Sequence, residues 1–261
     1  MKKRLKKIYI STIIFFLYAP ILLLVLYSFN ESRTRVKWTG ISLKWYIELF
    51  QDEMILSALR YTFLIAFLAA VLATVIGTMA AIGVFRMKKM SFNVIKNITY
   101  IPVLNPDIVT GISLMLVFVA LGIHLGFVSL LLAHVTFCIP YVILSVLPKL
   151  KQLDMSTYEA ALDLGATPMK ALWKVIVPEI LPGIITGFLL AFTLSVDDFV
   201  ISFFTTGNGV QNLSIAVFSM ARKGINPKIN AVSTLIFLLV ITVLLIVNKG
   251  AMKNIKKNGG S

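Results

Sequence analysis

Apolar residues of this chain gather into six long segments, separated by short polar stretches. A helix of about 20 apolar residues crosses the roughly 30 Å hydrocarbon layer of a bilayer. On this rule the segments cover about residues 8–29, 58–85, 98–121, 127–147, 184–206 and 231–247. The pattern therefore predicts an all-α membrane protein with six transmembrane helices.

Composition agrees with this class. The chain has 261 residues, of which 58% are hydrophobic and 14% charged, outside the range of soluble globular domains. The basic N-terminus and the first apolar run imitate a secretory signal, but the run is long enough to span and no small-residue cleavage site follows. We expect a retained anchor with an external loop at 1–57, a membrane core at 58–248 and a basic tail at 249–261.

Basic residues predict the orientation. Seventeen of the 25 lysines and arginines lie in the N-terminus, the second loop, segment 149–183 and the tail. Loops rich in lysine and arginine stay in the cytoplasm, so both termini and segment 149–183 are expected there. The net charge of +14 follows from this topology, and nucleic-acid binding is not expected.

The first external loop predicts a short helix over 42–50 that lies flat on the membrane surface. Four apolar residues recur there at helical spacing: Leu43, Tyr46, Ile47 and Phe50. The aromatic residues Trp38, Trp45 and Tyr46 suit the interfacial belt, where an apolar ring body and a polar edge are both satisfied.

Small residues and prolines predict how the spans pack and bend. A stripe on the second span lets another helix approach closely: Ala66, Ala70, Ala73, Gly77 and Ala80 or Ala81. Kinks are expected in the third and fourth spans at Pro102, Pro106, Gly111 and Pro140.

Segment 149–183 is patterned as two short helices around a glycine. Ser156 and Glu159 have the spacing of a capping box, and Gly165 reaches the left-handed conformation that ends a helix. Thr167 as N-cap and Pro168 at the first position predict the second helix.

The end and the surface of this segment are also predicted. We expect proline to stop the second helix before the next span, at Pro178 and Pro182. Its apolar residues are Tyr158, Leu162, Leu164, Leu172 and Trp173. Because they lie between membrane spans, the segment is expected to dock on lipid headgroups or on a partner protein.

Three acids lie at apolar depth: Asp107, Asp197 and Asp198. Each costs about 2.5 to 3.5 kcal/mol at a bilayer centre, so such residues normally face a protein-lined cavity. A cation beside the adjacent pair would relieve their mutual repulsion, and Tyr141 and Phe199 could add cation–π faces. We therefore predict that these five residues line a path for a cationic substrate.

Structural roles for the acids remain open. Asn105 could cap a helix that begins at Pro106, with Asp107 at its positive end. No cap pattern is evident for Asp197 and Asp198, although Ser195 could cap a restarted helix. If the carboxylates line a path, Asp198→Asn is expected to weaken transport more than assembly.

The sequence lacks the motifs of several enzyme classes. It has no phosphate-binding GxxxxGK[ST] loop, no GxSxG or HExxH motif and no identifiable nucleophile–base pair. With only His124, His134 and Cys138 as soft ligands, a metal site is not expected. We expect neither a cofactor nor a catalytic residue, and ATP hydrolysis would require a partner.

Segment 149–183 resembles the EAA loop of permease subunits in bacterial ATP-binding-cassette importers. The resemblance rests on Glu159-Ala160-Ala161, on Gly165, and on Val175-Ile176-Val177-Pro178 in place of the usual Ile-x-Leu-Pro. It implies a type I importer permease fold, in which this loop is the coupling helix that fits a groove on the ATPase. The residues implied in that contact are Glu159, Ala160, Ala161, Gly165 and Pro178.

Six further stretches extend the resemblance almost end to end: SFNESR, KWY, PDIVTGISL, LGIHLGF, HVTFCIPYV and FTLSVDDFVIS. Together they resemble the PotC-type permease subunits of spermidine/putrescine importers. The resemblance implies polyamine import across a bacterial cell membrane. It also implies a second permease, two ATPase subunits and an extracellular polyamine-binding protein as partners.

Other functions remain open. Related importers of ferric iron, thiamine or other small cations share much of this pattern. The aspartates could also be ion sites of a proton- or sodium-coupled secondary transporter. An intramembrane enzyme is a third class, which the missing catalytic constellation disfavours.

Overall fold

The computed structural model describes residues 2–33, 37–207, 209–224, 227–238 and 241–242. It forms two compact units, one of Met1–Leu56 with Ala216–Ser261 and one of Ser57–Ile215. The division into anchor, core and tail stays a prediction, and the tail at 249–261 lies outside the described residues.

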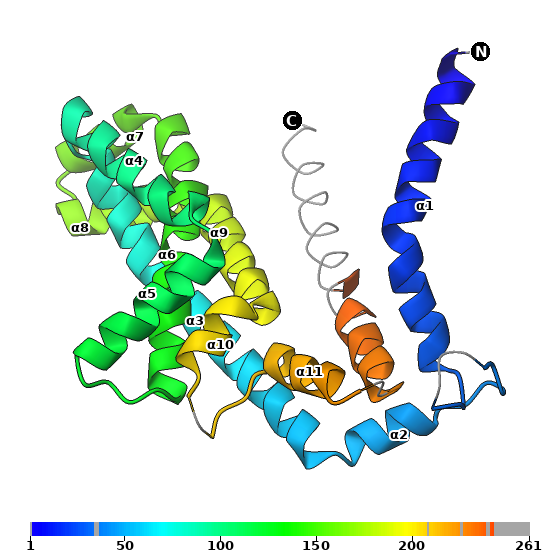
Figure 1. Cartoon of the computed structure of the whole chain (residues 1–261). Helices are drawn as coiled ribbons and strands as arrows, with labels where there is room; N and C mark the ends of the chain where they lie inside the picture. Colours follow the sequence, from blue (N-terminus) through cyan, green and yellow to red (C-terminus); the bar gives the residue numbers. More distant parts are fainter. Residues whose placement is uncertain (1, 34–36, 208, 225–226, 239–240, 243–261) are drawn as a thin grey trace. The chain divides into compact units, whose positions relative to one another are not determined.

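The named elements are helices (Figure 1). They are α1 (Lys2–Ser28), α2 (Lys44–Phe50), α3 (Glu53–Phe85), α4 (Lys89–Leu104), α5 (Asp107–Ala120), α6 (Phe127–Gln152), α7 (Met155–Asp163), α8 (Pro168–Ala171), a π-helical turn (Leu172–Ile176), α9 (Val177–Asp197), α10 (Val200–Thr205) and α11 (Leu213–Arg222). The predicted all-α class is confirmed.

Four helices in the described part of the chain are long and apolar enough to cross a membrane: Leu5–Ser28, Glu53–Phe85, Phe127–Gln152 and Pro168–Asp197. The bent pair α4 and α5 makes a fifth candidate. The predicted sixth span at 231–247 lies partly outside the described residues. Its first part belongs to the shorter apolar helix Pro227–Leu238.

Unit Ser57–Ile215 is built on α6, which packs against α9, α4, α5 and α10. The predicted small-residue stripe on α3 is buried, with Ala70 and Ala73 fully so. A Cβ at Gly77 would lie 2.8 Å from Val142 on α6, and one at Gly183 would lie 3.1 Å from the Ser145 carbonyl oxygen. Larger side chains would therefore push α3 and α9 away from α6.

The third predicted span is broken rather than kinked. Helices α4 and α5 meet at an angle of 102° at the Asn105–Pro106 break. Proline removes a backbone donor and drives the preceding residue out of helical conformation, and Asn105 is extended with ψ 141°. The alternative that Asn105 caps the next helix was wrong, because α5 begins at Asp107 and Pro106 precedes it without a side-chain cap; Asp107 does lie at the positive end of this helix.

The sequence predicted that the second helix of the segment stops at the prolines, but helix α8 continues past them. It passes through the π-helical turn Leu172–Ile176 directly into α9, so that Pro178 lies in the first turn of α9 and Pro182 inside it. The π-turn shifts the register of the backbone hydrogen bonds directly before Pro178, where the proline has no N–H to donate. The predicted fifth span therefore begins earlier, and it ends at Asp197 rather than at residue 206.

In unit Met1–Leu56 with Ala216–Ser261, the predicted surface helix is present as α2. Trp45 does not face outward, however: it is 2% exposed, and its indole N–H donates to the Asn30 carbonyl at 2.6 Å. The residues left outward on α2 are Ile47 and Phe50, 59% and 61% exposed. A buried partner for the indole satisfies its polar edge without water, which overturns the prediction for Trp45.

Candidate functional site

The break between α9 and α10 carries the two adjacent acids. Asp197 is the last residue of α9, and Asp198 is extended with ψ 128° before α10 begins at Val200. Their environments differ. Asp197 is exposed, whereas the Asp198 side chain is 6% exposed. The two carboxylates therefore cannot serve the same purpose.

Asp198 closes the first turn of α10. Its Oδ1 accepts the Ile201 amide at 3.2 Å, and its Oδ2 accepts the Ser202 amide at 2.7 Å and the Ser202 hydroxyl at 2.8 Å. A carboxylate in this place satisfies free amides and stabilises the positive end of a helix. The expectation of no cap at this pair was wrong, and so was the alternative of Ser195 as the cap.

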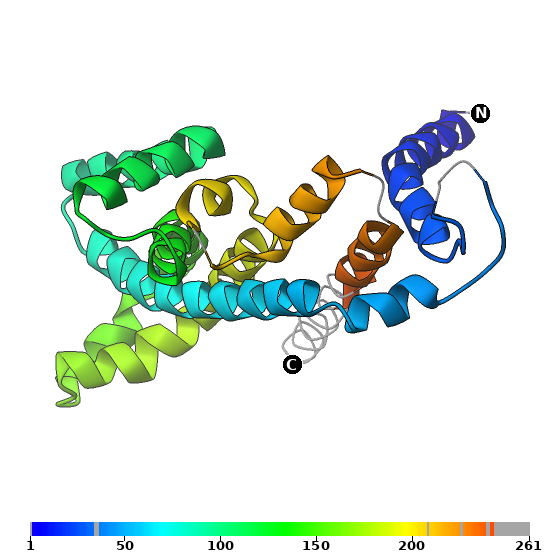
Figure 2. The ribbon, with the colours of Figure 1, turned by 60° about the horizontal axis from the view of Figure 1, so that its bottom comes forward.

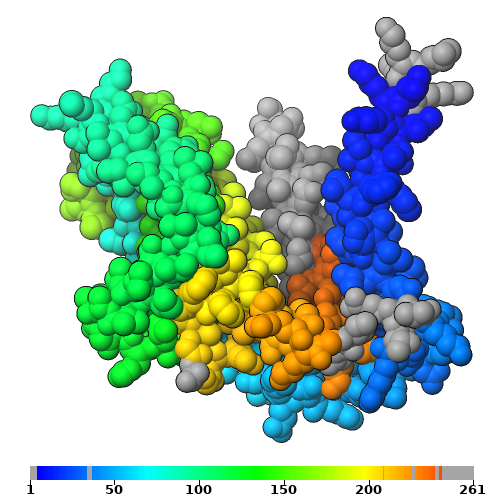
Figure 3. All heavy atoms as spheres, in the orientation of Figure 1, coloured from blue at the N-terminus to red at the C-terminus, as the bar shows by residue number. Residues whose placement is uncertain are grey.

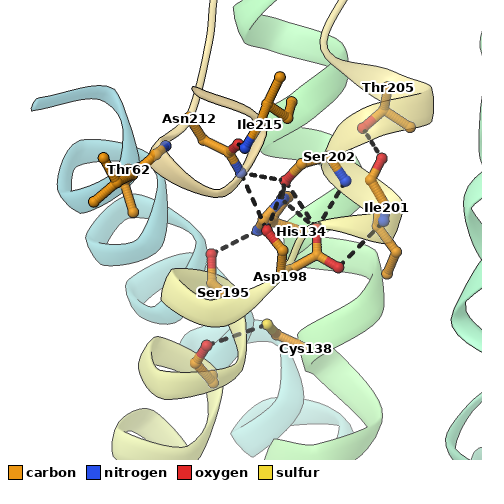
Figure 4. A network of polar contacts seen from close by, with 12 residues as sticks. Thr62, His134, Cys138, Ser195, Asp198, Ile201, Ser202, Thr205, Asn212 and Ile215 are labelled. Atoms are coloured by element: carbon orange, nitrogen blue, oxygen red, sulfur yellow. Dashed lines mark hydrogen bonds and ion pairs between the residues drawn. The ribbon is translucent and has the colours of Figure 1, made fainter. Parts of the chain in front are cut away.

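His134 of α6 joins the two sides of this break (Figure 4). Its Nδ1 lies 2.6 Å from the Ser195 hydroxyl of α9, and its Nε2 lies 2.9 Å from the Ser202 hydroxyl of α10. The same Nε2 lies 3.5 Å from Asp198 Oδ2. One arrangement of protons satisfies every group: Ser195 donates to Nδ1, Nε2–H donates to Ser202 and Asp198, and Ser202 donates to Asp198.

Asn212 extends the network to the start of α11. Its amide nitrogen donates to the Ser202 hydroxyl at 2.6 Å and to the Asp198 carbonyl at 3.2 Å, and its side-chain oxygen accepts the Ile215 amide at 3.0 Å. The neighbouring Leu213 amide donates to the Thr62 hydroxyl of α3 at 2.7 Å. Five elements of unit Ser57–Ile215 thus meet at one buried polar cluster.

We name this set of five side chains the break network: His134, Ser195, Asp198, Ser202 and Asn212. The sequence predicted only Asp198 among them. A histidine inside an apolar span was the available signal, because an intramembrane ionisable residue indicates a functional position. The sequence prediction considered His134 only as a metal ligand.

The contacts of Ser195, His134 and Asp198 follow the order of an acyl-transfer triad. The chemistry is nevertheless unsupported. Ser195 and His134 are each 2% exposed, and a nucleophile must reach its substrate. The network is therefore a structural link between helices.

The remaining predicted path residues lie on surfaces near this cluster. Asp107 is exposed at the start of α5 and lies within electrostatic range of the Tyr141 hydroxyl of α6. Phe199, beside Asp197, lies 5.6 Å ring to ring from Phe203, which is 47% exposed. Asp107 and Tyr141 thus lie within electrostatic range of each other on α5 and α6, whereas Asp197 and Phe199 are near in sequence, and the path role of these residues and of Asp198 stays a prediction.

Helix α5, which begins at Asp107, packs closely against α10, which begins just after Phe199. A Cβ at Gly111 of α5 would lie 3.1 Å from the Phe204 ring and 3.3 Å from the Ile201 Cα of α10. Their surfaces, green and yellow, meet in Figure 3. The position of Asp107 therefore depends on the same helix that Asp198 caps.

Segment 149–183 lies at the end of unit Ser57–Ile215 away from α10 (Figures 1 and 2). The predicted turn is confirmed, with Gly165 at φ +82°, and Thr167 caps α8 by accepting the Lys170 amide at 3.4 Å. The capping box was wrong. Asp154 caps α7 by accepting the Ser156 amide at 3.0 Å, and this hydrogen bond holds the pKa of the Asp154 carboxyl below its ordinary value.

Tyr158 fastens α7 to the end of α3, instead of lying on the exposed surface as expected. It is 8% exposed, its hydroxyl accepts from Arg86 Nη2 at 3.0 Å, and the guanidinium lies 5.4 Å from the ring centre. Of the five apolar residues predicted at this surface, Leu164 and Trp173 stay outward, 90% and 64% exposed. Glu159, Ala160, Gly165 and Pro178 are exposed and Ala161 is half-buried.

Comparison with known families gives one match over most of the chain. Residues 73–257 match the model described as "Binding-protein-dependent transport system inner membrane component".

Two curated relatives are similar over most of their length. The putrescine transport system permease protein PotI of Escherichia coli (strain K12) is 46% identical over 228 residues, covering 85% of this chain and 81% of the relative. The spermidine/putrescine transport system permease protein PotC of Haemophilus influenzae is 38% identical over 250 residues, covering 96% and 97%.

Solved structures share the fold. A bacterial ABC transporter involved in the import of alginate has a TM-score of 0.73 at 16% identity, covering 95% of each chain. The MetNI methionine ABC transporter has a TM-score of 0.63 at 17% identity, covering 78% of this chain and 98% of that one. These similarities concern the fold.

Proposed function

This chain belongs to the family of binding-protein-dependent transport system inner membrane components, and from that premise we propose that it is the permease subunit of an ATP-binding-cassette importer for polyamines. The observation that carries the proposal is the 46% and 38% identity to permeases named for putrescine and spermidine/putrescine transport. Because the family consists of membrane-embedded transport subunits and not of catalytic ones, this chain is also a multi-pass membrane protein.

The exposed carboxylates support a cationic cargo. Asp197 and Asp107 are exposed acids on helices expected to be in the membrane; Phe199 follows Asp197 by two residues, and Tyr141 lies within electrostatic range of Asp107. An ammonium group gains from a carboxylate and from an aromatic face, and the latter is worth about 0.5 to 2 kcal/mol. Two separated anionic positions match a flexible cargo that carries more than one amine.

The partners follow from what the chain lacks and what it exposes. Energy would come from two ATPase subunits that bind segment 149–183 through Leu164, Trp173 and the EAA residues. Arg86 and Tyr158 would pass movement of α7 to the end of α3. A second permease would complete the path, and an external binding protein would deliver the polyamine.

The orientation is proposed from charge. Segment 149–183 carries Lys149, Lys151, Lys170 and Lys174, and the N-terminus is similarly basic, so both face the cytoplasm. The α2 loop then lies outside. Access would alternate by rigid-body movement of helices around the break between α9 and α10.

An uptake experiment separates this function from its alternatives. The assembled complex is reconstituted in proteoliposomes, and uptake of labelled putrescine is measured with unlabelled spermidine, thiamine or ferric iron as competitors. We expect spermidine alone to compete, and a protonophore to leave uptake unchanged while ATP is maintained. Competition by thiamine or iron would mean that the cargo is another cation and not a polyamine. Loss of putrescine uptake under the protonophore would favour an ion-coupled carrier.

A further inference from the structure

The break between α9 and α10 is bridged by a side chain from a third helix. Along the chain only Asp198 and Phe199 connect the two helices. Through space, His134 contacts Ser195 on the α9 side at 2.6 Å and Ser202 on the α10 side at 2.9 Å. One ring therefore sets the distance between the two helix ends.

The link is rigid because every group in it is buried and satisfied. His134, Ser195 and Ser202 are at most 2% exposed, so water cannot replace a broken contact. A buried polar group without a partner costs about 1 to 3 kcal/mol. Movement of α10 relative to α9 thus breaks several bonds at once.

What the link holds in place is Asp197. Ser195 and Asp197 both belong to α9, and helical residues two positions apart point about 200° apart, so the inward direction of Ser195 fixes the outward direction of Asp197. Ser195 is held inward by the His134 ring, whose Nδ1 lies 2.6 Å from its hydroxyl. A change at His134 would turn Asp197 without touching it.

We propose that His134 is a positioning residue of the transport path, which locks the angle between α9 and α10 and thereby holds the Asp197 carboxylate toward the cargo. The cargo role of Asp197 rests on the proposed function; the geometric role of His134 does not. The alternative is that His134 is only a buried side chain that fills space between three helices.

Substitutions at His134 can separate the two arms of the ring. Leucine keeps most of the volume and removes both contacts. The amide of asparagine lies near the place of Nδ1 and can keep the Ser195 contact, whereas the amide of glutamine lies near Nε2 and can keep the Ser202 contact. Should His134→Leu not fold, Ser195→Ala removes one arm and adds no volume.

A thiol reporter reads the direction of residue 197 independently of any cargo. Asp197→Cys is made in the full chain within its complex, and the rate of modification by a cationic methanethiosulfonate is measured. The unmodified chain is the control, because its Cys138 is fully buried and is expected to stay unlabelled. The same reporter is then combined with each His134 variant and with Ser195→Ala.

We expect His134→Leu and Ser195→Ala to change the labelling rate at least threefold, and the asparagine and glutamine variants to lie between leucine and histidine. Equal rates in all variants would overturn the proposal, and so would polar variants that behave like leucine.

A transport measurement without the reporter gives the second readout. His134→Leu is expected to raise KM for putrescine at least threefold, with the maximal rate within twofold. A lower maximal rate at unchanged KM would indicate a merely structural residue and overturn the proposal. If the parental complex moved no polyamine, the proposed function would fail, whereas the labelling rates would still decide the role of His134.

Discussion

The contrast between Asp197 and Asp198 gives the sharpest prediction. The sequence alone suggested that Asp198→Asn weakens transport more than assembly, but the contacts of Asp198 reverse that expectation. Its side chain is 6% exposed and accepts three hydrogen bonds, from the Ile201 amide and from the amide and hydroxyl of Ser202. Asp197 is exposed at the end of α9.

The magnitude follows from these contacts. Asparagine keeps one acceptor oxygen, so at least one hydrogen bond to a charged group is lost, worth about 1.5 to 3 kcal/mol. The new amide N–H₂ also faces a backbone donor, which is left unsatisfied. A total loss of about 2 to 4 kcal/mol corresponds to a fall in melting temperature of roughly 4 to 16 °C for a chain of this size.

The assay is thermal denaturation of the solubilised complex followed by size-exclusion chromatography, with Asp197→Asn as the matched control. We expect Asp198→Asn to lower the melting temperature and Asp197→Asn to leave it unchanged. In transport the order reverses: a surface ion pair is worth about 0.2 to 1 kcal/mol, so Asp197→Asn raises KM for putrescine by up to about fivefold. If Asp198→Asn melted like the parent and Asp197→Asn did not, the assignment would be refuted.

Three further predictions test other parts of the structure. Arg86→Gln removes the contact with Tyr158 and is expected to at least halve transport per ATP hydrolysed, whereas Lys96→Gln, which loses only a surface contact with Tyr100, leaves this ratio unchanged; equal ratios would refute the link. Gly111→Leu separates α5 from α10 and is expected to destabilise the complex by about 1 to 3 kcal/mol, measured by the same melting assay, while Gly83→Leu, where a Cβ meets nothing within 4 Å, is the tolerated control. Burial raises the pKa of the Asp52 carboxyl, but the Lys228 ion pair at 3.0 Å and the backbone amides outweigh it and hold that pKa below its ordinary value. A carboxyl whose pKa is depressed in the folded state stabilises the fold above its unfolded pKa of about 3.9, and this stabilisation is lost as the pH falls through the folded pKa. The melting temperatures of the parent and Asp52→Asn should therefore converge as the pH falls below about 4. A difference that stays constant would contradict this.

Local sequence signals predicted much of the fold. The apolar runs located the helices because each must cover its own backbone in lipid. Gly165 and the Thr167–Pro168 pair predicted a turn and a helix start correctly, since both depend on residues within one turn of the chain.

The site depended on contacts that no local pattern contains. Ser195 and Ser202 are joined by His134, which lies on another helix, and the buried Trp45 donates its N–H to the distant Asn30 carbonyl. The prolines at 178 and 182 did not end a helix: Pro178 lies in the first turn of α9, directly after the π-helical turn, and Pro182 lies inside α9. Such outcomes depend on tertiary partners rather than on spacing.

The central claim is that this permease carries polyamine through an acid-lined path on energy supplied by a partner's ATP hydrolysis. The most direct measurement is the number of putrescine molecules accumulated per ATP hydrolysed, in proteoliposomes that contain the complete complex. The account predicts that accumulation stops when ATP is withheld and that Asp197→Asn requires more putrescine for the same rate. Accumulation by this chain alone, without nucleotide, would contradict it.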